Sequence, residues 1–237
     1  MCAIGLIPTA AVEQHGPHLP LSTDFLLAVE LGKRTAARVE ELVITAPPAP
    51  GGLSDHHLAF PGTVSFSKET FVGVIDAYVA AFDRMGITDV AIFSSHGGNF
   101  SALAEYAEQH PGVAVYADLA GFLEVMFQGA REGGFDPVAT DAHAGGVETS
   151  LALAAFPELV REYDGVTGLS DPYDGWLDDV LQKGIDGVSA TGVLGDVRPS
   201  SAEAGEAIFE SVANLLAGWL VETFGLTPSA LQPRVAR

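Results

Sequence analysis

Short apolar runs alternate with longer amphipathic stretches along most of this 237-residue chain. Four runs show no helical periodicity, which predicts strands buried on both faces: 3–8, 43–46, 90–93 and 113–116. Other stretches space their apolar side chains as helices do, at about 25–42, 68–85, 100–109, 122–131 and 203–224, and one more helix is expected between residues 141 and 157. This alternation predicts an α/β fold, a three-layer α/β/α sandwich with a mainly parallel central sheet.

The length and the 48% hydrophobic content suit one large domain, which we expect to span residues 1–226. Residues 157–200 are rich in Asp and Gly and predict little regular structure. A long irregular excursion of this kind is typical of a lid or an oligomer contact. Residues 227–237 are expected to form a flexible tail.

The charge balance narrows the classes of partner. The chain has 11 Lys plus Arg against 31 Asp plus Glu, a formal net charge of −20. This acidity suits a salt-rich cytoplasm or simply a self-repelling surface, and it excludes nucleic acids and anionic membranes as expected partners. The chain lacks an apolar run of the ~18 residues that span a membrane, and its start does not resemble a signal peptide. With Cys2 as the single cysteine, we expect a soluble, cytoplasmic protein without an internal disulfide.

The densest group of chemically active side chains follows the first apolar run. Residues 13–24, EQHGPHLPLSTD, contain two acids, two histidines and a glutamine. In an extended backbone Glu13 and His15 project to the same side, and Asp24 has two oxygens with which it could bridge a pair of ions. Mixed imidazole and carboxylate ligands suit Zn²⁺, Mn²⁺ or Fe²⁺, so the stretch predicts a metal site. Each residue taken alone could equally be a solvated loop side chain.

A second candidate ligand comes directly after another predicted strand. His96 precedes Gly97, Gly98 and Asn99. The carboxyl end of a strand is where α/β sheets place their functional groups, and the glycines let a backbone approach a ligand closely. The same glycines could simply allow a tight turn, and they lack the Lys and Ser/Thr of a phosphate loop.

His143 and Glu148 form a third candidate pair. Their spacing of five residues does not place them on one face of a helix. The two glycines between them allow a turn in which Glu148 opens a helix as a metal ligand, although an acid that only interacts with the helix dipole is the competing interpretation. His143 is then the natural general acid/base, and Asp141 and Thr149 could orient both groups.

Other side chains offer rival chemistry. Ser94 and Ser95 could supply a nucleophile, but their spacing does not resemble the G-x-S-x-G elbow. His56 and His57 lie in a loop where exposure is the default, and only one of them is expected to matter. Two further histidines are placed outside the site: His18 and His110.

Together these segments resemble the creatininase family of metal-dependent amidohydrolases. The matching pieces run in family order: EQHGPHLP with TD (13–24), FPGT (60–63), HGGN (96–99), HAG with ETS (143–150) and GVLGD (192–196). The resemblance implies an α/β/α fold, two divalent ions per chain (Zn, Mn or Fe) and cytoplasmic homo-oligomers, often hexamers.

The resemblance also implies roles for individual residues. It assigns the metal ligands as two pairs and a bridge: Glu13 with His96, His15 with Glu148, and Asp24 between them. His143 matches the family's catalytic histidine, and His57 matches a histidine of the loop before the Pro-Gly-Thr segment. Creatininase itself carries an acid or a tryptophan where this chain has Gly98 and Gly146, so creatinine is not the expected substrate.

We therefore predict hydrolysis of a C–N amide bond in a cyclic amide, a formamide or a similar small molecule. A metal-bridged hydroxide would attack the carbonyl, and His143 would protonate the departing nitrogen. Another branch of the family trims the peptide precursor of mycofactocin, so a peptidase acting on a small modified peptide is the alternative. A non-catalytic, metal-stabilised binding protein is the third possibility.

Overall fold

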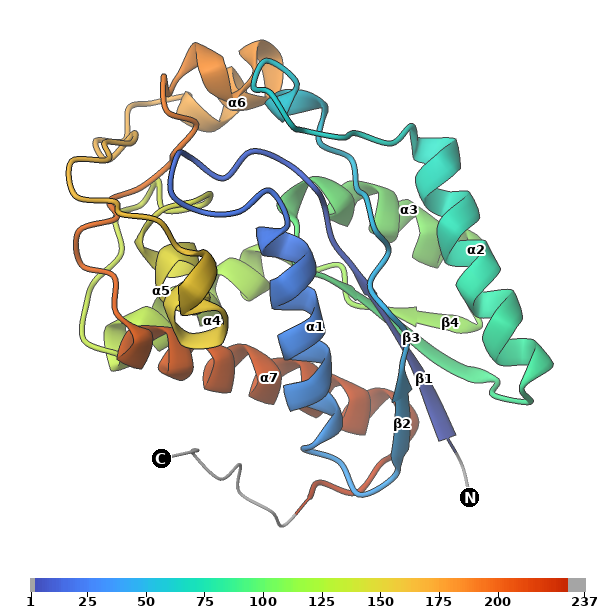
Figure 1. The fold of residues 1–237 in the computed structure, drawn as a ribbon. Coiled ribbons are helices and arrows are strands. Elements are labelled where there is room, and N and C mark those ends of the chain that lie inside the picture. The colour runs from blue at the N-terminus through green and yellow to red at the C-terminus, as the bar shows by residue number, and fades with distance from the viewer. Residues whose placement is uncertain (1–2, 230–237) are drawn as a thin grey trace.

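The computed structural model describes residues 3–229, and a sheet of four parallel strands lies at its centre (Figure 1). β1 (Ala3–Thr9) lies between β2 (Leu42–Thr45) and β3 (Asp89–Ser94), and β4 (Val113–Val115) pairs with β3. A helix occupies each crossover, as parallel strands require. The predicted α/β class and parallel sheet are confirmed.

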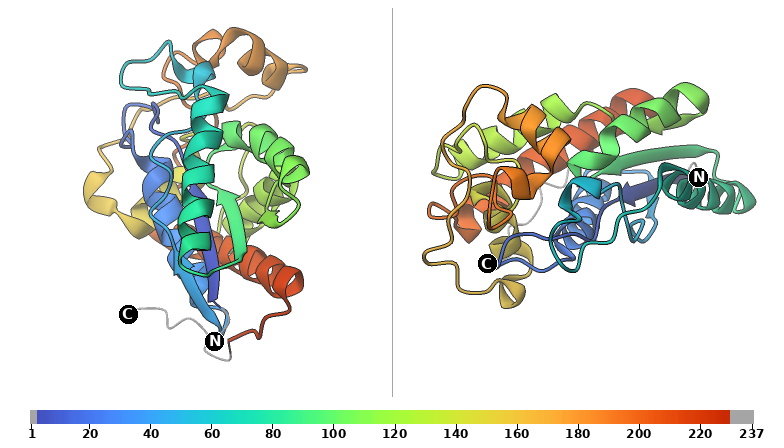
Figure 2. Two further views of the ribbon diagram at one scale, coloured as in Figure 1. Left: turned by 90° about the vertical axis from the view of Figure 1, so that its right-hand side faces the viewer. Right: turned by 90° about the horizontal axis from the view of Figure 1, so that it is seen from above.

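Helices cover both faces of the sheet (Figures 1 and 2). They are α1 (Thr23–Ala36), α2 (Lys68–Arg84), α3 (Phe100–Gln109), α4 (Leu119–Glu132), α5 (Gly146–Ala155), α6 (Trp176–Lys183) and α7 (Ala202–Phe224). The core cluster on one face includes residues of α2 and α3, and the cluster on the other includes residues of α1, α4, α5 and α7. The three predicted layers are therefore present.

Alternation along the strands sorts side chains between these two cores, because successive residues of a strand point to opposite faces. In β1, Leu6 packs with the α1 and α7 side and Ile7 with the α2 and α3 side. In β3, Phe93 packs with the α1 and α7 side and Ile92 with the α2 and α3 side. Both central strands are buried on both faces, which explains why their sequences read as continuous apolar runs.

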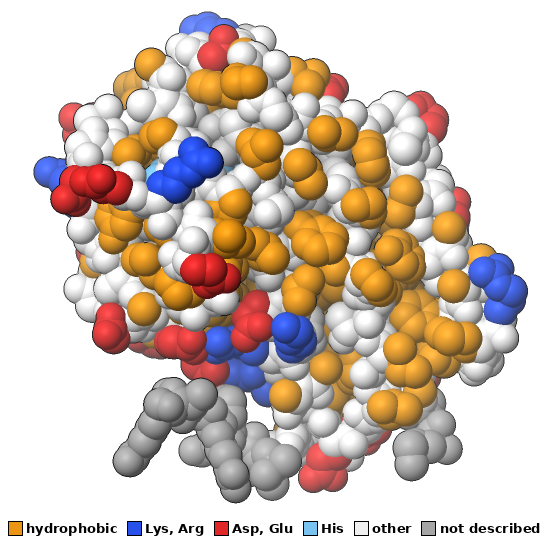
Figure 3. Space-filling model, in the orientation of Figure 1, with side chains coloured by type: hydrophobic (Ala, Val, Ile, Leu, Met, Phe, Trp, Pro, Cys, Tyr) orange, Lys and Arg blue, Asp and Glu red, His pale blue; other side chains and the backbone are white. Residues whose placement is uncertain are grey.

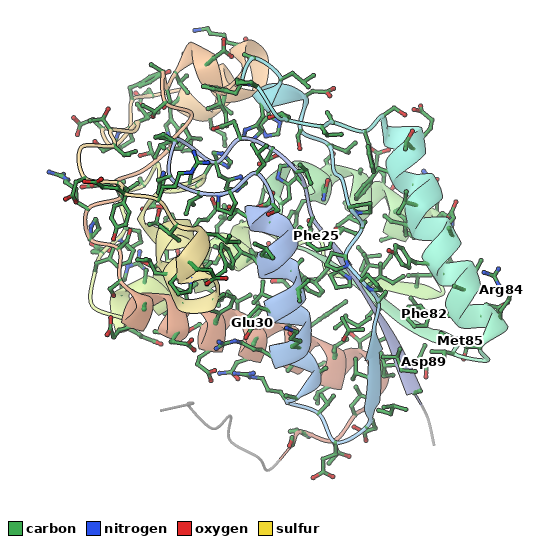
Figure 4. All side chains as sticks on the ribbon, in the orientation of Figure 1. Phe25, Glu30, Phe82, Arg84, Met85 and Asp89 are labelled. Atoms are coloured by element: carbon green, nitrogen blue, oxygen red, sulfur yellow. The ribbon has the colours of Figure 1, made fainter. Side chains whose placement is uncertain are left out.

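The end of α2 shows how closely a helix approaches the sheet. Figure 4 draws Phe82, Arg84 and Met85 together there, near Asp89 at the start of β3. The ring of Phe82 is buried and would lie 2.8 Å from a Cβ at position 5 of β1. Gly5 therefore allows this contact, and any larger residue would have to displace the ring.

α7 is the longest helix of the described chain, and by length and composition alone it could cross a membrane. Its apolar side instead packs on α4, α5 and α1. Two arginines also bind its acidic side: Arg34 of α1 contacts Glu206, and Arg38, two residues beyond the end of α1, contacts Glu210, each at 2.7 Å. α7 therefore packs as a core helix of this domain.

Several predicted boundaries are wrong. α1 ends at Ala36 rather than near residue 42, because residues 42–45 join the sheet as β2. α4 begins three residues early, where the Asp118 side chain accepts a hydrogen bond from the N–H of Gly121 and caps the helix. Residues 157–200 contain α6 and two short 3-10 turns, where little regular structure is predicted.

The structure describes only the first three residues of the predicted tail, 227–229. The N–H of Ser229 donates to the carbonyl of Arg38, and the N–H of Thr227 donates to the Glu41 carboxylate. Residues 227–229 are therefore hydrogen-bonded to the segment after α1. Residues 230–237 lie outside the described part of the chain.

Candidate metal centre

The register of β1 and β3 brings the first two motifs together. Thr9 and Ser94 are paired at the carboxyl ends of these strands, so the chain beyond each strand emerges at the same edge of the sheet. Glu13 and His15 follow β1, and His96 follows β3. This is the edge at which open α/β sheets bind their ligands.

The other side chains of the predicted site come from the first turns of two helices and from the loop that carries His143. Asp24 lies in the first turn of α1, and Glu148 lies in the first turn of α5. The backbone of His143 pairs with that of Leu194 in the GVLGD segment. The N–H of Leu194 donates to the carbonyl of His143 at 2.8 Å. The excursion 157–200 thus helps to hold His143 in place.

The first donor group consists of Glu13, Asp24 and His96. Their donor atoms lie within 4.8 Å of one another. The Nδ1 atom of His96 is 3.3 Å from Glu13 Oε1 and 3.3 Å from Asp24 Oδ2. Three such donors around one point can hold a divalent ion.

The second donor group lies on the other side of Asp24. His15 Nε2 is 3.3 Å from Asp24 Oδ1 and 3.6 Å from Glu148 Oε2. Asp24 thus turns one oxygen towards each of the two histidines, which is the arrangement that a bridging carboxylate needs. The structure brings all five predicted ligands together: Asp24 belongs to the first donor group, and its other oxygen contacts His15, which forms a second group with Glu148 and His143.

Unpartnered atoms show that cations fit this cluster. Both carboxylate oxygens of Glu13, Oδ2 of Asp24 and Nε2 of His15 are buried without a hydrogen-bond partner. Little histidine surface is visible on the face drawn in Figure 3. Burying polar and charged groups without compensation costs several kcal/mol, so these atoms require a bound ion or proton.

The imidazoles of His15 and His96 are also oriented as metal binding would require. The Nδ1 atom of His15 donates to the Glu13 carbonyl at 3.2 Å, which leaves Nε2 for the cluster. The Nε2 atom of His96 donates to the Leu53 carbonyl at 3.1 Å, which leaves Nδ1. Hydrogen bonds from the far nitrogen commonly fix metal-binding histidines in this way.

The charges in the cluster shift pKa values in opposite directions. Burial by itself lowers the pKa of His15, but Asp24 and Glu148 raise it to about 10. His96 behaves similarly beside Glu13, with its pKa well above the ordinary value. Burial raises the pKa of Glu148 to about 7. Without metal, the carboxylates therefore hold protons on the two histidines, and a cation would have to displace those protons.

Gln14 connects two further histidines that face the cluster. Its amide orientation is fixed because Oε1 accepts a hydrogen bond from Gly16 N–H at 3.0 Å. The amide nitrogen then donates to His57 Nδ1 at 2.9 Å and to the Gly192 carbonyl at 3.2 Å. His57 therefore carries its proton on Nε2, which is 3.2 Å from Glu13 Oε1.

The tautomer of His143 follows from the same residue. Its Nε2 lies 2.8 Å from the backbone carbonyl of Gln14 and 3.0 Å from the amide nitrogen of the same residue. The two amide protons are directed to His57 and to the Gly192 carbonyl, and a carbonyl can only accept, so Nε2 of His143 carries the proton. The lone pair of Nδ1 faces Glu13 Oε1 at 3.6 Å and Glu148 Oε2 at 4.0 Å. Burial and the nearby His15 hold the pKa of His143 well below its usual value, so the ring is neutral.

His143 can also act as a metal donor. It forms a compact group with His15 and Glu148, and a second group with Glu13 and His57. His143 also lines the cavity described below, so the geometry alone permits either a metal-binding or a proton-transfer role.

Asp141 and Thr149 hold the start of α5. Asp141 accepts hydrogen bonds from the N–H groups of Gly146 at 3.0 Å and Val147 at 3.2 Å, and burial raises its pKa to about 7. Thr149 Oγ1 is 2.8 Å from Nε2 of the buried His18. Both residues orient the helix that carries Glu148 and do not themselves reach the donor groups.

The residues that follow His96 in the HGGN segment help to hold its side chain in place. A Cβ on Gly98 would lie 2.3 Å from the Leu53 carbonyl and 2.5 Å from His96 Nε2, so glycine permits the hydrogen bond between them. Asn99 ties the surrounding loops together, with its amide donating to the Ala10 carbonyl and accepting from Leu53 N–H. Gly97 lines the cavity described next.

A cavity of about 390 Å³ opens over the cluster. Glu13, His57, His96, His143 and Glu148 contribute to one part of its lining. Volumes of this size are typical of sites for small organic ligands. The donor groups therefore face a space that can admit a substrate.

The serine alternative finds no support in this geometry. Ser95 Oγ donates to the carbonyl of Asp24 at 2.8 Å, and Ser94 Oγ lies 3.0 Å from the carbonyl of His96. A serine nucleophile needs an adjacent base to take its proton. These hydroxyls instead contact the backbone of two candidate ligands, Asp24 and His96.

Two residues of this network have no assigned role in the sequence prediction. Gln14 lies between two predicted ligands, and its position in EQH is the only signal of its role. His18 is placed outside the site by sequence, yet its side chain is buried and contacts Thr149. Its two flanking prolines gave no indication of a contact with residue 149, which is distant in the chain.

Comparisons with known proteins agree with this geometry. A family model described as creatinine amidohydrolase matches residues 1–220. The mycofactocin precursor peptide peptidase of Mycolicibacterium smegmatis is 31% identical over 221 residues, covering 90% of this chain and 83% of that protein. The solved structure of a mutant creatininase of Zn-Zn type is 28% identical to this chain, with a TM-score of 0.71. The match covers 94% of this chain and 91% of the creatininase chain. A creatininase described with Mn is also 28% identical, with a TM-score of 0.69 and the same coverage.

Proposed function

The chain belongs to the creatininase family, and on that premise we propose that it is a metal-dependent hydrolase that cleaves a peptide bond in a small modified peptide. The observation that carries the proposal is the pair of donor groups that Asp24 links, beneath a cavity that also exposes His143. The family supports hydrolysis of a C–N bond. The peptide substrate rests on the relative at 31% identity, which is a peptide peptidase.

The donor groups divide between two ions. Glu13, His96 and one oxygen of Asp24 would hold the first, and His15, Glu148 and the other oxygen of Asp24 would hold the second. Zn²⁺ and Mn²⁺ suit these ligands, and related structures are described as Zn-Zn or Mn forms. When bound, the two ions would polarise the scissile carbonyl and make water at the site more acidic.

His143 is placed to move the proton that hydrolysis requires. Water is added across the C–N bond, so a hydroxyl goes to the carbonyl carbon and a proton to the departing nitrogen. The neutral Nδ1 of His143 faces the cluster and the cavity, where it can take a proton from water and pass it to that nitrogen. The Gln14 carbonyl holds the ring in the tautomer that this transfer needs.

A small cyclic amide or a formamide, which the sequence alone favours, is the second candidate substrate. The observation behind it is the similarity to solved creatininases over 94% of the chain. The cavity distinguishes the two, since it extends well beyond the donor groups. A peptide would use that added space, and a formamide would not.

The proposal is tested with metal-free protein reloaded with Zn²⁺, Mn²⁺ or Fe²⁺ and offered short peptides, lactams and formamides, with products identified by mass spectrometry. Metal-dependent cleavage of peptides is expected. His143→Ala should lose about 10²–10⁴-fold in turnover while keeping its metal, because general acid–base catalysis contributes that much. His110→Ala, at the end of α3, is the matched histidine control.

The outcomes separate the candidates. Turnover of a lactam or formamide without peptide cleavage would replace the peptide by the second substrate. Full metal loading without hydrolysis of any amide would contradict the hydrolase assignment itself.

A further inference from the structure

We propose that the substrate carries a bulky, uncharged apolar group, aromatic or branched aliphatic, next to the amide that is cut, and that this group lies between α4 and α6. The inference rests on the proposed hydrolase function and specifies the chemistry of its substrate. Its basis is the composition of the cavity away from the metal donors.

One wall of this part of the cavity is a face of α4. Leu119, Phe122, Leu123 and Met126 line it. Their spacing of three, four and seven residues places them on one side of the helix. The apolar side of α4 therefore serves two purposes, since it packs against α7 and also faces the cavity.

A second part of the lining comes from the excursion at residues 157–200. Trp176, Leu177 and Val180 of α6 line the cavity together with Ile185. Val180 and Ile185 are buried in a small cluster with Leu194, which anchors α6 beside the segment that pairs with His143. In Figure 1, α6 lies near the turn 55–57 that carries His57, and these two elements are in contact.

Leu177 is the residue that points most clearly to an occupant. It is 53% exposed although it lies on the cavity wall. Apolar surface is stabilised by removal from water, and a large apolar side chain left open beside a catalytic cluster is available for that contact with a ligand. An apolar substrate group would cover Leu177 and Trp176 together.

The charges of the lining exclude an anionic group in this part of the cavity. Among the described residues that line it, none is Lys or Arg. Glu124 lines it and is exposed, and its ion-pair partner Arg131 does not belong to the lining. A substrate carboxylate placed here would lose water without gaining a cation and would face a carboxylate of the same charge.

A matched series of peptides tests this preference. The peptides differ in one residue beside the scissile bond, which is Gly, Leu, Phe or Asp. We expect kcat/KM for Leu and Phe to exceed that for Gly by on the order of tenfold to hundredfold, which corresponds to burial of one large side chain. The Asp peptide should be the poorest. Equal rates across the series would overturn the inference and leave the hydrolase assignment standing.

Leu177→Lys provides the matched variant. Its exposure makes the substitution tolerable for folding, and the new ammonium should lower the preference for Phe over Asp by about tenfold or more. Leu159→Lys is the control, since Leu159 is also exposed, at 43%, and does not line the cavity. An unchanged preference in Leu177→Lys would contradict the inference.

Binding to metal-free protein separates this inference from the hydrolase assignment. The chain has two tryptophans, and Trp219→Phe leaves Trp176 as the only one, so selective excitation of tryptophan reports on Trp176 alone. N-acetyl-phenylalaninamide should change its emission with a saturable response, and N-acetyl-phenylalanine, which has the same ring and a carboxylate, should bind at least tenfold more weakly. Equal binding of both probes, or binding of neither, would overturn the inference. Selective binding in a protein that hydrolyses no amide would support it and contradict the proposed function.

Discussion

The backbone carbonyl of Gln14 accepts a hydrogen bond from Nε2 of His143 at 2.8 Å. This contact fixes the tautomer of His143, so the lone pair of Nδ1 faces the metal donors. The side chain of Gln14 sets the tautomer of His57 in the same way. One residue between two candidate metal ligands thus controls the protons of two further histidines.

Gln14→Met should lower kcat by about 10–100-fold, because hydrogen bonds that orient the groups of a metal site have effects of that size. Methionine has a similar length but cannot donate to His57, while the backbone contact to His143 is retained. Steady-state kinetics with metal content measured on the same samples checks this prediction. Gln128→Met on the exposed side of α4 is the control, and an unaltered kcat and pH profile in Gln14→Met would contradict the role of Gln14.

Removal of metal should lower the melting temperature. Both oxygens of Glu13, Oδ2 of Asp24 and Nε2 of His15 are buried without hydrogen-bond partners, so a bound cation stabilises the folded chain and not the unfolded one. At a free metal concentration of 100 Kd, one site adds about 2.7 kcal/mol, or about 5–11 °C for a chain of this length. Thermal unfolding with and without a chelator measures the shift. Equal melting temperatures would show that this cluster does not hold metal.

Stability of the metal-free protein should fall as the pH drops below about 6.5, in part because of His18. Burial and the nearby His15 lower the pKa of His18 in the folded state to about 4, from 6.5 for an unperturbed histidine. Between these values the unfolded chain binds more protons, so stability decreases as pH falls from 6.5 towards 4.

The comparison that isolates His18 is urea unfolding of wild type and His18→Gln at pH 7.5 and pH 5. Glutamine can still hydrogen-bond to Thr149 but does not titrate. The variant should therefore lose less stability between the two pH values than the wild type does. An equal loss in both proteins would show that His18 does not contribute to the pH dependence.

The sequence predicted most of the helices from their amphipathic spacing and the strands from short apolar runs that lack it, and the alternation of the two predicted a mainly parallel sheet. It also placed Glu13, His15, Asp24, His96 and Glu148 in one site, and the structure brings them together. Each follows a strand or opens a helix, and the parallel topology collects such positions at one edge.

The parts that sequence did not predict depend on contacts between distant segments. α6 is short, and its amphipathic pattern is lost among the Asp and Gly residues around it. The apolar cavity wall joins α4 to α6, which are more than forty residues apart, so no local pattern identifies it. His18 was placed outside the site for the same reason, since its partner Thr149 lies 131 residues away.

If Asp24 bridges two metal ions, the number of ions bound per chain must depend on its carboxylate. Elemental analysis of protein dialysed against Zn²⁺ or Mn²⁺ should find two tightly bound ions per chain in the wild type. Asp24→Asn has the same shape but a neutral side chain that cannot bridge two cations, and should retain less than one. Glu30→Gln on the outer part of the same helix should retain two. A wild type that binds no more than one ion, or an Asp24→Asn variant that keeps both, would contradict the claim.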